Sequence, residues 1–448
     1  MTAPMPNQPA ATPNAQRLNP RALDALRQRD FRRFWLAALV SNTGSWMQGA
    51  AIPFVAFSLT GSAGAIGVTG FFQYLPFMVM GLVGGSLADR FPRRTLLIST
   101  QAAQAACATA LFVMVYTGVV TTAWLAGLAF VSGLAAGLNT PVWQSFVAEL
   151  VSRDLLLNAV TLNSAQFNAA RALGPLLTGI IVSGIGVSWA FALNAASFAI
   201  VIVVLLGLRV SSDGIRRNVS EGAVAGIRTA GRYVLASPPI LACCMAIAAV
   251  AGLGSPLFSY LVVYGEEVLQ VSGLRLGILF GAAGIGSVIF TPALLSIAPR
   301  IQRSRLLSGA MVLYGLSVVA TGLAPTYFTL VLALLCFGGA YLAIASTINT
   351  SIQLVVRDEL RGTVIAIYLM CLTGALPIGI FVWGKLSDIY GIQPVTIAAG
   401  TLLLMVTVLF ILTGRFHVMA DADAARDAAA AGPKPSAEPS EEPRLSSD

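Results

Sequence analysis

The stretch Gly85-Ser-Leu-Ala-Asp89-Arg90-Phe-Pro-Arg93-Arg94 joins two long apolar segments and concentrates one acid and three arginines within ten residues. Charge is scarce elsewhere, because only 10% of the 448 residues are charged and 56% are hydrophobic. Charged turns between apolar segments are typical of a chain that crosses a membrane repeatedly, since charged side chains are costly inside the bilayer. The stretch therefore predicts a multi-spanning membrane protein with this turn at one membrane surface.

Twelve apolar segments are long enough to cross a bilayer as helices, which takes about 20 residues each. They cover residues 34–59, 65–88, 95–115, 123–147, 159–184, 188–208, 239–263, 276–297, 306–323, 327–350, 363–384 and 393–412. Because a spanning backbone must satisfy its own polar groups, these lengths predict an all-α integral membrane protein. A partial repeat relates the halves, since Ser62 and Gly67 open the second segment as Ser272 and Gly277 open the eighth. We expect two six-helix bundles of like orientation with a solute path between them.

Arginine is concentrated in the turns that follow even-numbered segments, whereas the other turns hold only Arg275 and Lys385 as basic residues. Cytoplasmic loops carry an excess of Lys and Arg. This bias predicts a multi-pass protein of the cytoplasmic (inner) membrane with both termini in the cytoplasm. Because the basic residues follow the topology, the net charge of +8 does not indicate a protein that binds nucleic acid. The polar first thirty residues do not resemble a cleavable signal peptide, so we expect the first segment to act as the insertion signal.

Composition divides the chain into five parts. We expect a cytoplasmic N-terminal arm at 1–33, a first bundle at 34–208, a cytoplasmic amphipathic linker at 209–237, a second bundle at 238–415 and a disordered cytoplasmic tail at 416–448. The linker places Ile227 and Val234 on one helical face beside arginines, which is typical of an interfacial helix. The tail is rich in Ala, Pro, Ser, Glu and Asp and lacks the apolar periodicity that a packed core requires.

The sequence offers no site for catalysis, for a metal or for a cofactor. All five cysteines fall inside apolar segments, where a free thiol behaves as a small hydrophobic residue, and the lone histidine, His417, follows the last segment. No Walker sequence is present, and Gly281, Gly284 and Gly286 lie within an apolar segment without a strand before them. We therefore predict a protein that is not an enzyme and that does not use ATP.

The charged stretch resembles the loop between the second and third helices of the major facilitator superfamily, of the form Gly-x-x-x-Asp-Arg-x-x-Arg-Arg. The matching residues are Gly85, Asp89, Arg90, Arg93 and Arg94, with Pro92 in place of the more usual glycine. The resemblance implies that Asp89 holds a cytoplasmic gate closed, because an acid at a helix end can accept hydrogen bonds from the free amides of a neighbouring helix. Glu149, at the end of the fourth segment, is a natural partner for one of the arginines. Alternatively, these charges serve only to set the topology.

A second resemblance, to the enterobactin-exporter branch or transmembrane secretion effector family, covers most of the first half. It rests on Arg29-Asp-Phe-Arg-Arg-Phe-Trp35 and on the order Arg153-Asp154, Asn158-Ala159, Asn163, Arg171 and Gly174-Pro175. Gly174, Pro175 and Gly179 also resemble the antiporter signature of the fifth helix, although only one glycine follows the proline. A Gly/Pro kink that packing tolerates is the alternative. The branch implies export of a small organic molecule in exchange for protons.

Arg171 lies near the middle of the fifth segment, where an arginine costs roughly 2.5–3.5 kcal/mol to insert. Helical periodicity places it on one face with Asn163. Either it binds an anionic or strongly hydrogen-bonding substrate, or it donates structural bonds to backbone carbonyls or asparagine. Amide and aromatic side chains one turn apart in two other segments complete the predicted substrate cavity, which comprises Asn42, Trp46, Asn139, Trp143, Asn163 and Arg171.

No Asp or Glu lies in the middle of any segment, although embedded carboxylates commonly carry protons in coupled pumps. The carboxylates near the segment ends are Glu149 on the arginine-rich side and Glu266, Glu267 and Asp388 on the other. We expect Asp388 to pair with Lys385, one helical turn away. Glu149 and Glu266 are therefore the predicted proton carriers.

Together these features predict a secondary active transporter, a monomer in the lipid bilayer. It would export a small organic molecule, such as a siderophore, drug or amphipathic metabolite, by alternating access with protons as the driving ion. An importer or facilitator of an organic anion is the alternative, with Arg171 as the anchor. A membrane scaffold or sensor that transports nothing is less favoured, because the tail carries no recognisable domain.

Overall fold

The computed structural model describes residues 23–208, 231–271, 273–356 and 360–416, without the side chains of residues 81–90, 299, 361 and 362. Residues 1–22 of the predicted arm, residues 209–230 of the linker and the tail from residue 417 lie outside the described residues. The described part of the chain is built from helices and short turns, with no strand among them.

Ten helical segments of this part are long and apolar enough to span a membrane. They are α2 (Ala63–Arg90), α3 (Arg93–Tyr116), α4 (Thr122–Glu149), α6 (Ser188–Gly207), the composite segment Pro238–Val268, α10 (Leu274–Ile297), α11 (Arg303–Leu323), α12 (Tyr327–Val355), α13 (Arg361–Tyr390) and α14 (Ile392–Leu412). Two further helices, α1 (Arg29–Thr60) and α5 (Leu156–Gly184), are as long but lack an equally apolar stretch. With these two, the predicted spans are all accounted for, and the all-α membrane fold is confirmed.

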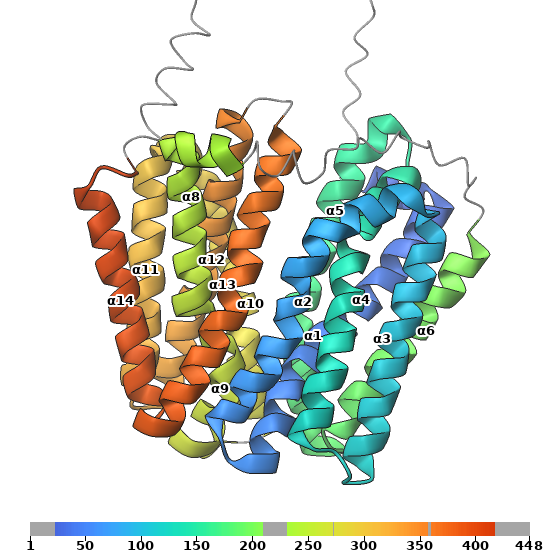
Figure 1. Cartoon of the computed structure of the whole chain (residues 1–448), viewed down its shortest axis with the longest axis horizontal. Helices are drawn as coiled ribbons and strands as arrows, with labels where there is room; N and C mark the ends of the chain where they lie inside the picture. Colours follow the sequence, from blue (N-terminus) through green and yellow to red (C-terminus); the bar gives the residue numbers. More distant parts are fainter. Residues whose placement is uncertain (1–22, 209–230, 272, 357–359, 417–448) are drawn as a thin grey trace, which may run out of the picture.

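The helices stand in two bundles side by side (Figure 1). In the first bundle α2 packs against α4, α1 against α5 and α3 against α6. In the second bundle α10 packs against α12, the composite segment against α13 and α11 against α14, which repeats the pairing of the first. The two bundles meet where α2 packs against α13 and α5 against α10.

The seventh span is not a continuous α-helix. It consists of α8 (Pro238–Ala249), a π-helical turn (Val250–Gly254), a 3₁₀ turn (Ser255–Tyr260), α9 (Leu261–Val263) and a second π-helical turn (Tyr264–Val268). Gly252, Gly254 and Pro256 account for the break, because glycine weakens a helix and proline removes a backbone donor. Such π-helical turns are frequent at functional sites.

The charged stretch is mostly helical, which corrects its description as a turn. α2 continues through Arg90, and only Phe91 and Pro92 separate it from α3. Proline disfavours helical backbone at the residue before it, so the chain reverses at this dipeptide. The acid and the first arginine of the motif therefore lie on the last turn of α2.

The bundles converge at the end where α9 lies (Figure 1). Two glycine pairs permit the close approach: a Cβ atom on Gly384 would lie 3.0 Å from Gly67 Cα, and one on Gly277 would lie 2.7 Å from Gly179 Cα. Small residues let helix backbones touch in a membrane. We call these four residues, Gly67, Gly179, Gly277 and Gly384, the glycine seam, and it closes the space between the bundles at this end.

Candidate functional site

Arg171 lies between the two bundles, with an aromatic ring from each beside it. It is half-buried on α5, and its guanidinium carbon is 5.6 Å from the Trp46 ring centroid and 4.8 Å from the Tyr341 ring centroid. Trp46 belongs to α1 of the first bundle and Tyr341 to α12 of the second. A guanidinium within about 6 Å of a ring centroid is attracted by the negative face of the ring. The intramembrane charge is therefore stabilised from both sides of the bundle interface.

The Arg171 guanidinium forms no hydrogen bond and no ion pair with any described residue. Arginine stays charged and presents its N–H donors in a rigid planar fork. A ring attracts the charge through its face, whereas the in-plane donors need an oxygen or nitrogen acceptor. The alternative of bonds to asparagine or backbone carbonyls finds no support among the described residues, and the donor edge of the fork has no protein acceptor there.

Further rings extend this aromatic wall. Phe167, one turn before Arg171 on α5, meets the Trp46 ring edge-on with centroids 5.8 Å apart. Phe258, from the 3₁₀ turn of the seventh span, meets the same ring at 6.3 Å and is itself 5.4 Å from Phe280. The side chains that the ring contacts place around the arginine are therefore mostly aromatic and apolar.

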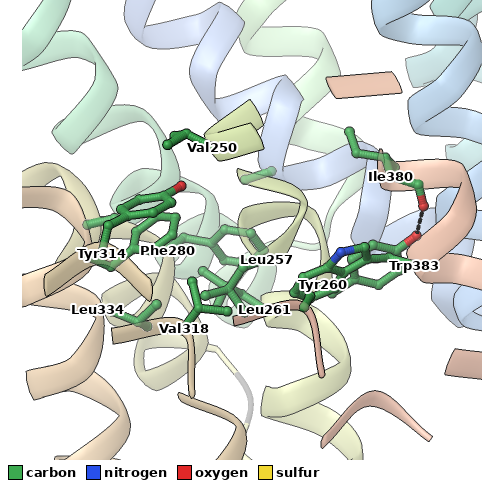
Figure 2. Packing of buried hydrophobic residues seen from close by; sticks show 14 of the residues in the cluster. Val250, Leu257, Tyr260, Leu261, Phe280, Tyr314, Val318, Leu334, Ile380 and Trp383 are labelled. Carbon is green, nitrogen blue, oxygen red and sulfur yellow. Dashed lines mark hydrogen bonds between the residues drawn. The ribbon is translucent and has the colours of Figure 1, made fainter. Parts of the chain in front are cut away.

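The break in the seventh span positions Tyr314 behind Tyr341. The Ser255 hydroxyl donates to the Val250 carbonyl at 3.2 Å and lies 3.2 Å from the Tyr314 hydroxyl. A Cβ atom on Gly254 would lie 3.1 Å from Tyr314 Cζ, so glycine leaves the room that this ring needs. Tyr314 is fully buried beside this turn (Figure 2), and its ring is 6.2 Å from that of Tyr341.

Ser255, Tyr314 and Tyr341 were not among the predicted cavity residues. Gly252, Gly254 and Pro256 near Ser255 could have predicted a site at this position, because interrupted helices mark binding sites in many transporters. A single tyrosine in an apolar helix carries no such signal, since it is indistinguishable from a core residue.

The predicted amides of α4 and α5 bond within the first bundle. Asn163 Oδ1 accepts a hydrogen bond from Trp143 Nε1 at 3.4 Å, and the Trp143 ring lies 4.3 Å from that of Phe34. Asn139 Oδ1 accepts a hydrogen bond from Thr100 Oγ1 at 2.9 Å. These three predicted cavity residues therefore join α4 to α1, α3 and α5.

Asn42 is half-buried on α1, and its amide has no hydrogen bond to another residue of the described part. It lies one helical turn before Trp46. Of the predicted cavity set, the structure thus brings Trp46 and Arg171 into direct contact.

The Gly174-Pro175 motif lies buried where α5 meets α1. A Cβ atom on Gly174 would lie 2.6 Å from Trp46 Cβ, and Thr178 Oγ1 donates to the Met47 carbonyl at 3.0 Å. Gly179, the third residue of the motif, belongs to the glycine seam instead. The motif therefore packs α5 against α1 within the first bundle and against α10 of the second bundle.

At the arginine-rich end, Glu149 forms an ion pair with Arg93, as expected. Arg94 Nη2 donates to the Leu206 carbonyl at 2.7 Å, which ties the start of α3 to the end of α6. The side chains of the other motif residues, Gly85, Asp89 and Arg90, lie outside the described part of the chain.

At the opposite end, Asp388 bridges the bundles. Its carboxylate accepts hydrogen bonds from Ser62 Oγ at 2.8 Å and from the Gly64 backbone N–H at 3.0 Å. The prediction that it pairs with Lys385 is wrong, because the first turn of α2 offers free backbone donors that an acid at this position can reach. Glu266 lies half-buried in the last turn of the seventh span, at this same end.

Several characterised transporters are similar to the chain over most of its length. The multidrug efflux pump Tap of Mycolicibacterium fortuitum is 23% identical over 392 residues, covering 85% of this chain and 95% of Tap. The staphyloferrin A transporter of Staphylococcus aureus is 21% identical, covering 85% and 96%. The enterobactin exporter EntS of Salmonella typhimurium is 24% identical, covering 69% and 73%.

Solved structures share the fold. A bacterial homologue of the lysosomal transporter Spinster, in an inward-facing and unoccupied conformation, superposes with a TM-score of 0.72 at 14% identity, covering 88% of this chain and 98% of that one. The nucleoside transporter NupG superposes with a TM-score of 0.70 at 13% identity, covering 86% and 98%.

The family model described as transmembrane secretion effector matches residues 21–441. This match includes both bundles and the contacts that join them. The chain therefore belongs to the transmembrane secretion effector family, a branch of the major facilitator superfamily, and is a membrane transporter rather than an enzyme.

Proposed function

We propose that this transporter exports a small organic molecule, such as a siderophore, drug or amphipathic metabolite, by alternating access and in exchange for protons. The observation that carries the proposal is the charged, aromatic site at Arg171, which both bundles contribute to. The efflux of drugs and siderophores named for the relatives supports the direction and the class of cargo.

The proposed topology follows the arginine-rich turns. Both termini face the cytoplasm of a monomer in the cytoplasmic membrane, with the arm at 1–33, the bundles at 34–208 and 238–415, the linker at 209–237 and the tail at 416–448. On this assignment the glycine seam faces away from the cytoplasm, and the closed seam makes the described state inward-facing.

The cycle that we propose has a gate at each end of the site. Rocking of the bundles would open the glycine seam and close the cytoplasmic end through the motif residues Gly85, Asp89, Arg90, Arg93, Arg94 and Glu149. Arg171, Trp46 and Asn42 would contact the cargo, while Asn139, Trp143 and Asn163 hold the wall behind them. Glu149 and Glu266 are the proposed proton carriers, since each is a carboxylate near a mouth of the path.

Uptake into inside-out membrane vesicles tests this function. With an acidic lumen, an exporter that exchanges cargo for protons should accumulate labelled cargo above its level without a gradient. Accumulation that ignores the gradient would contradict proton coupling. Flux of cargo down its own gradient in either direction, without dependence on the proton gradient, would favour the alternative, a facilitator or importer of an organic anion. The unpaired Arg171 donors also permit this alternative.

A further inference from the structure

We propose that Arg171 binds the anionic group of an amphipathic organic anion and that such anions are the cargo. This inference rests on the proposed transport function and names the chemistry of its substrate. It is argued from the charge, the geometry and the surroundings of the guanidinium.

The charge at the centre of the bundle interface has no acidic partner among the side chains that the structure describes. The acids with described side chains lie at helix ends or in turns, and they are Asp24, Asp30, Glu149, Asp154, Glu266, Glu267 and Asp388. Electrostatic interactions are stronger in a low-dielectric interior than in water. A cationic cargo would therefore be repelled at Arg171, whereas an anion would neutralise a charge that the protein leaves unpaired.

The N–H donors of Arg171 remain for a ligand. Trp46 and Tyr341 attract the guanidinium charge from 5.6 and 4.8 Å, but the donors have no oxygen or nitrogen acceptor among the described residues. Carboxylate and phosphate oxygens match these donors, because two parallel N–H···O bonds form between a planar fork and a pair of oxygens. A neutral amide offers a single oxygen and no charge, so it should bind more weakly.

The apolar part of the cargo has its own surface. Phe167 is 47% exposed although it lies one turn from Arg171 and touches Trp46, so its ring is accessible on the arginine-rich side of the site. Phe258 also meets the Trp46 ring edge-on, with the centroids 6.3 Å apart. Aromatic walls with few polar groups are typical of sites for small organic ligands, and the cargo should therefore combine an anionic head with an aromatic or aliphatic body.

The origin of the two rings couples binding to the cycle. Trp46 moves with the first bundle and Tyr341 with the second, so a change in the angle between the bundles separates one ring from the guanidinium. The site is then complete in the state with a closed glycine seam and incomplete in the opposite state. Cargo would consequently bind tightly from the arginine-rich side and be released on the other.

Matched pairs of probes test the proposal on the purified full-length protein. The probes are 2-naphthoate against 2-naphthamide and 4-phenylbutyrate against 4-phenylbutyramide, which differ mainly in charge, and binding is measured by calorimetry. We expect each carboxylate to bind about tenfold or more tightly than its amide, which corresponds to about 1.4 kcal/mol. Arg171→Gln should remove this preference, whereas Arg275→Gln, which removes an exposed arginine at the other end of the path, should preserve it.

Equal affinities within both pairs, or a preference of the wild type for the amides, would overturn the proposal. If Arg171→Gln does not fold, Arg171→Lys replaces it: lysine keeps the positive charge but lacks the planar fork of donors, so it should keep a weaker preference for the carboxylates, and an unchanged preference would contradict the bidentate bond. Gradient-driven flux of neutral or cationic compounds without preference for carboxylates would refute the anion site and leave the transport function standing. Absence of flux for every compound would refute the transport function itself.

Discussion

The Asp388 carboxylate, near the end of α13, accepts hydrogen bonds from Ser62 and from the backbone of Gly64 at the start of α2. An acid of the second bundle thus caps a helix of the first. The free N–H groups at a helix start carry partial positive charge, so an anion there is stabilising. Because the cap joins the bundles beside the glycine seam, we expect that opening of the seam breaks it.

Removal of the cap should favour the state with an open seam. A hydrogen bond to a charged group contributes roughly 1.5–3 kcal/mol, so Asp388→Ala should raise the open population by about tenfold or more. The reporter is Ala50→Cys in a background without native cysteines, because Ala50 is buried in a narrow cavity beside Gly179 and Gly277. A membrane-impermeant thiol reagent applied from the seam side should label it faster, and Lys385→Ala is the control. Equal labelling rates in both variants would contradict the role of the cap.

Bulk in the glycine seam should block its closure. A valine at Gly179 meets the backbone of Gly277, whereas a valine at Gly184, on the same helix, meets open space. Overpacking costs typically about 1–3 kcal/mol, and in this position it opposes one state of the cycle. Gly179→Val should therefore slow transport strongly at normal protein levels, and Gly184→Val should leave the rate near that of the wild type. Similar transport rates for the two variants would show that transport does not require the close contact between Gly179 and Gly277.

The Ser255–Tyr314 pair should stabilise the second bundle. Ser255→Ala leaves the buried Tyr314 hydroxyl without the partner 3.2 Å away, and an unsatisfied buried group costs about 1–3 kcal/mol. Tyr314→Phe removes the hydroxyl, so the double variant should be less destabilised than the sum of the two single variants. Thermal unfolding of the four proteins completes this cycle. Strictly additive losses would mean that the hydroxyls do not interact.

The Arg93–Glu149 pair should act on the conformational balance more than on stability. Both side chains are about one-third exposed, and exposed pairs contribute only about 0.2–1 kcal/mol. Glu149→Arg should lower transport with little change in the unfolding temperature, because like charges then meet at the arginine-rich end. The reversed pair Arg93→Glu with Glu149→Arg should restore the labelling rate of Ala50→Cys but not proton-driven transport, because Glu149 is a proposed proton carrier. A labelling rate that stays altered in the reversed pair would contradict the role of the ion pair, and full recovery of proton-driven transport would contradict the role of Glu149 as a carrier.

Bilayer thickness explains why the spans could be predicted closely from the sequence. The length of an apolar segment is a local property, and the helices begin and end near the predicted residues. Two segments differ from the prediction. The motif stretch is helical because a helix does not stop where its apolar residues stop, and the seventh span is broken because glycine and proline interrupt α-helical hydrogen bonding without changing hydropathy.

Contacts between the bundles could not be predicted in the same way. Ser62 and Asp388 are 326 positions apart, and local spacing pointed to Lys385 instead. Arg171 was identifiable because a charge in an apolar segment is conspicuous on its own. Its partner Tyr341 becomes recognisable only when α5 and α12 face each other across the bundle interface.

The two helices that carry Arg171 and Trp46 are also the two long helices that are not among the ten most apolar spans. During synthesis, α1 leaves the ribosome well before α5, and the two pack together in the finished bundle. Because α1 is synthesised before α5, it can shield the polar face of α5 from lipid, and Trp46 is then in place to contact Arg171. If Arg171 and Trp46 bind the cargo as proposed, the same residues also give α5 a reason to insert beside an earlier helix.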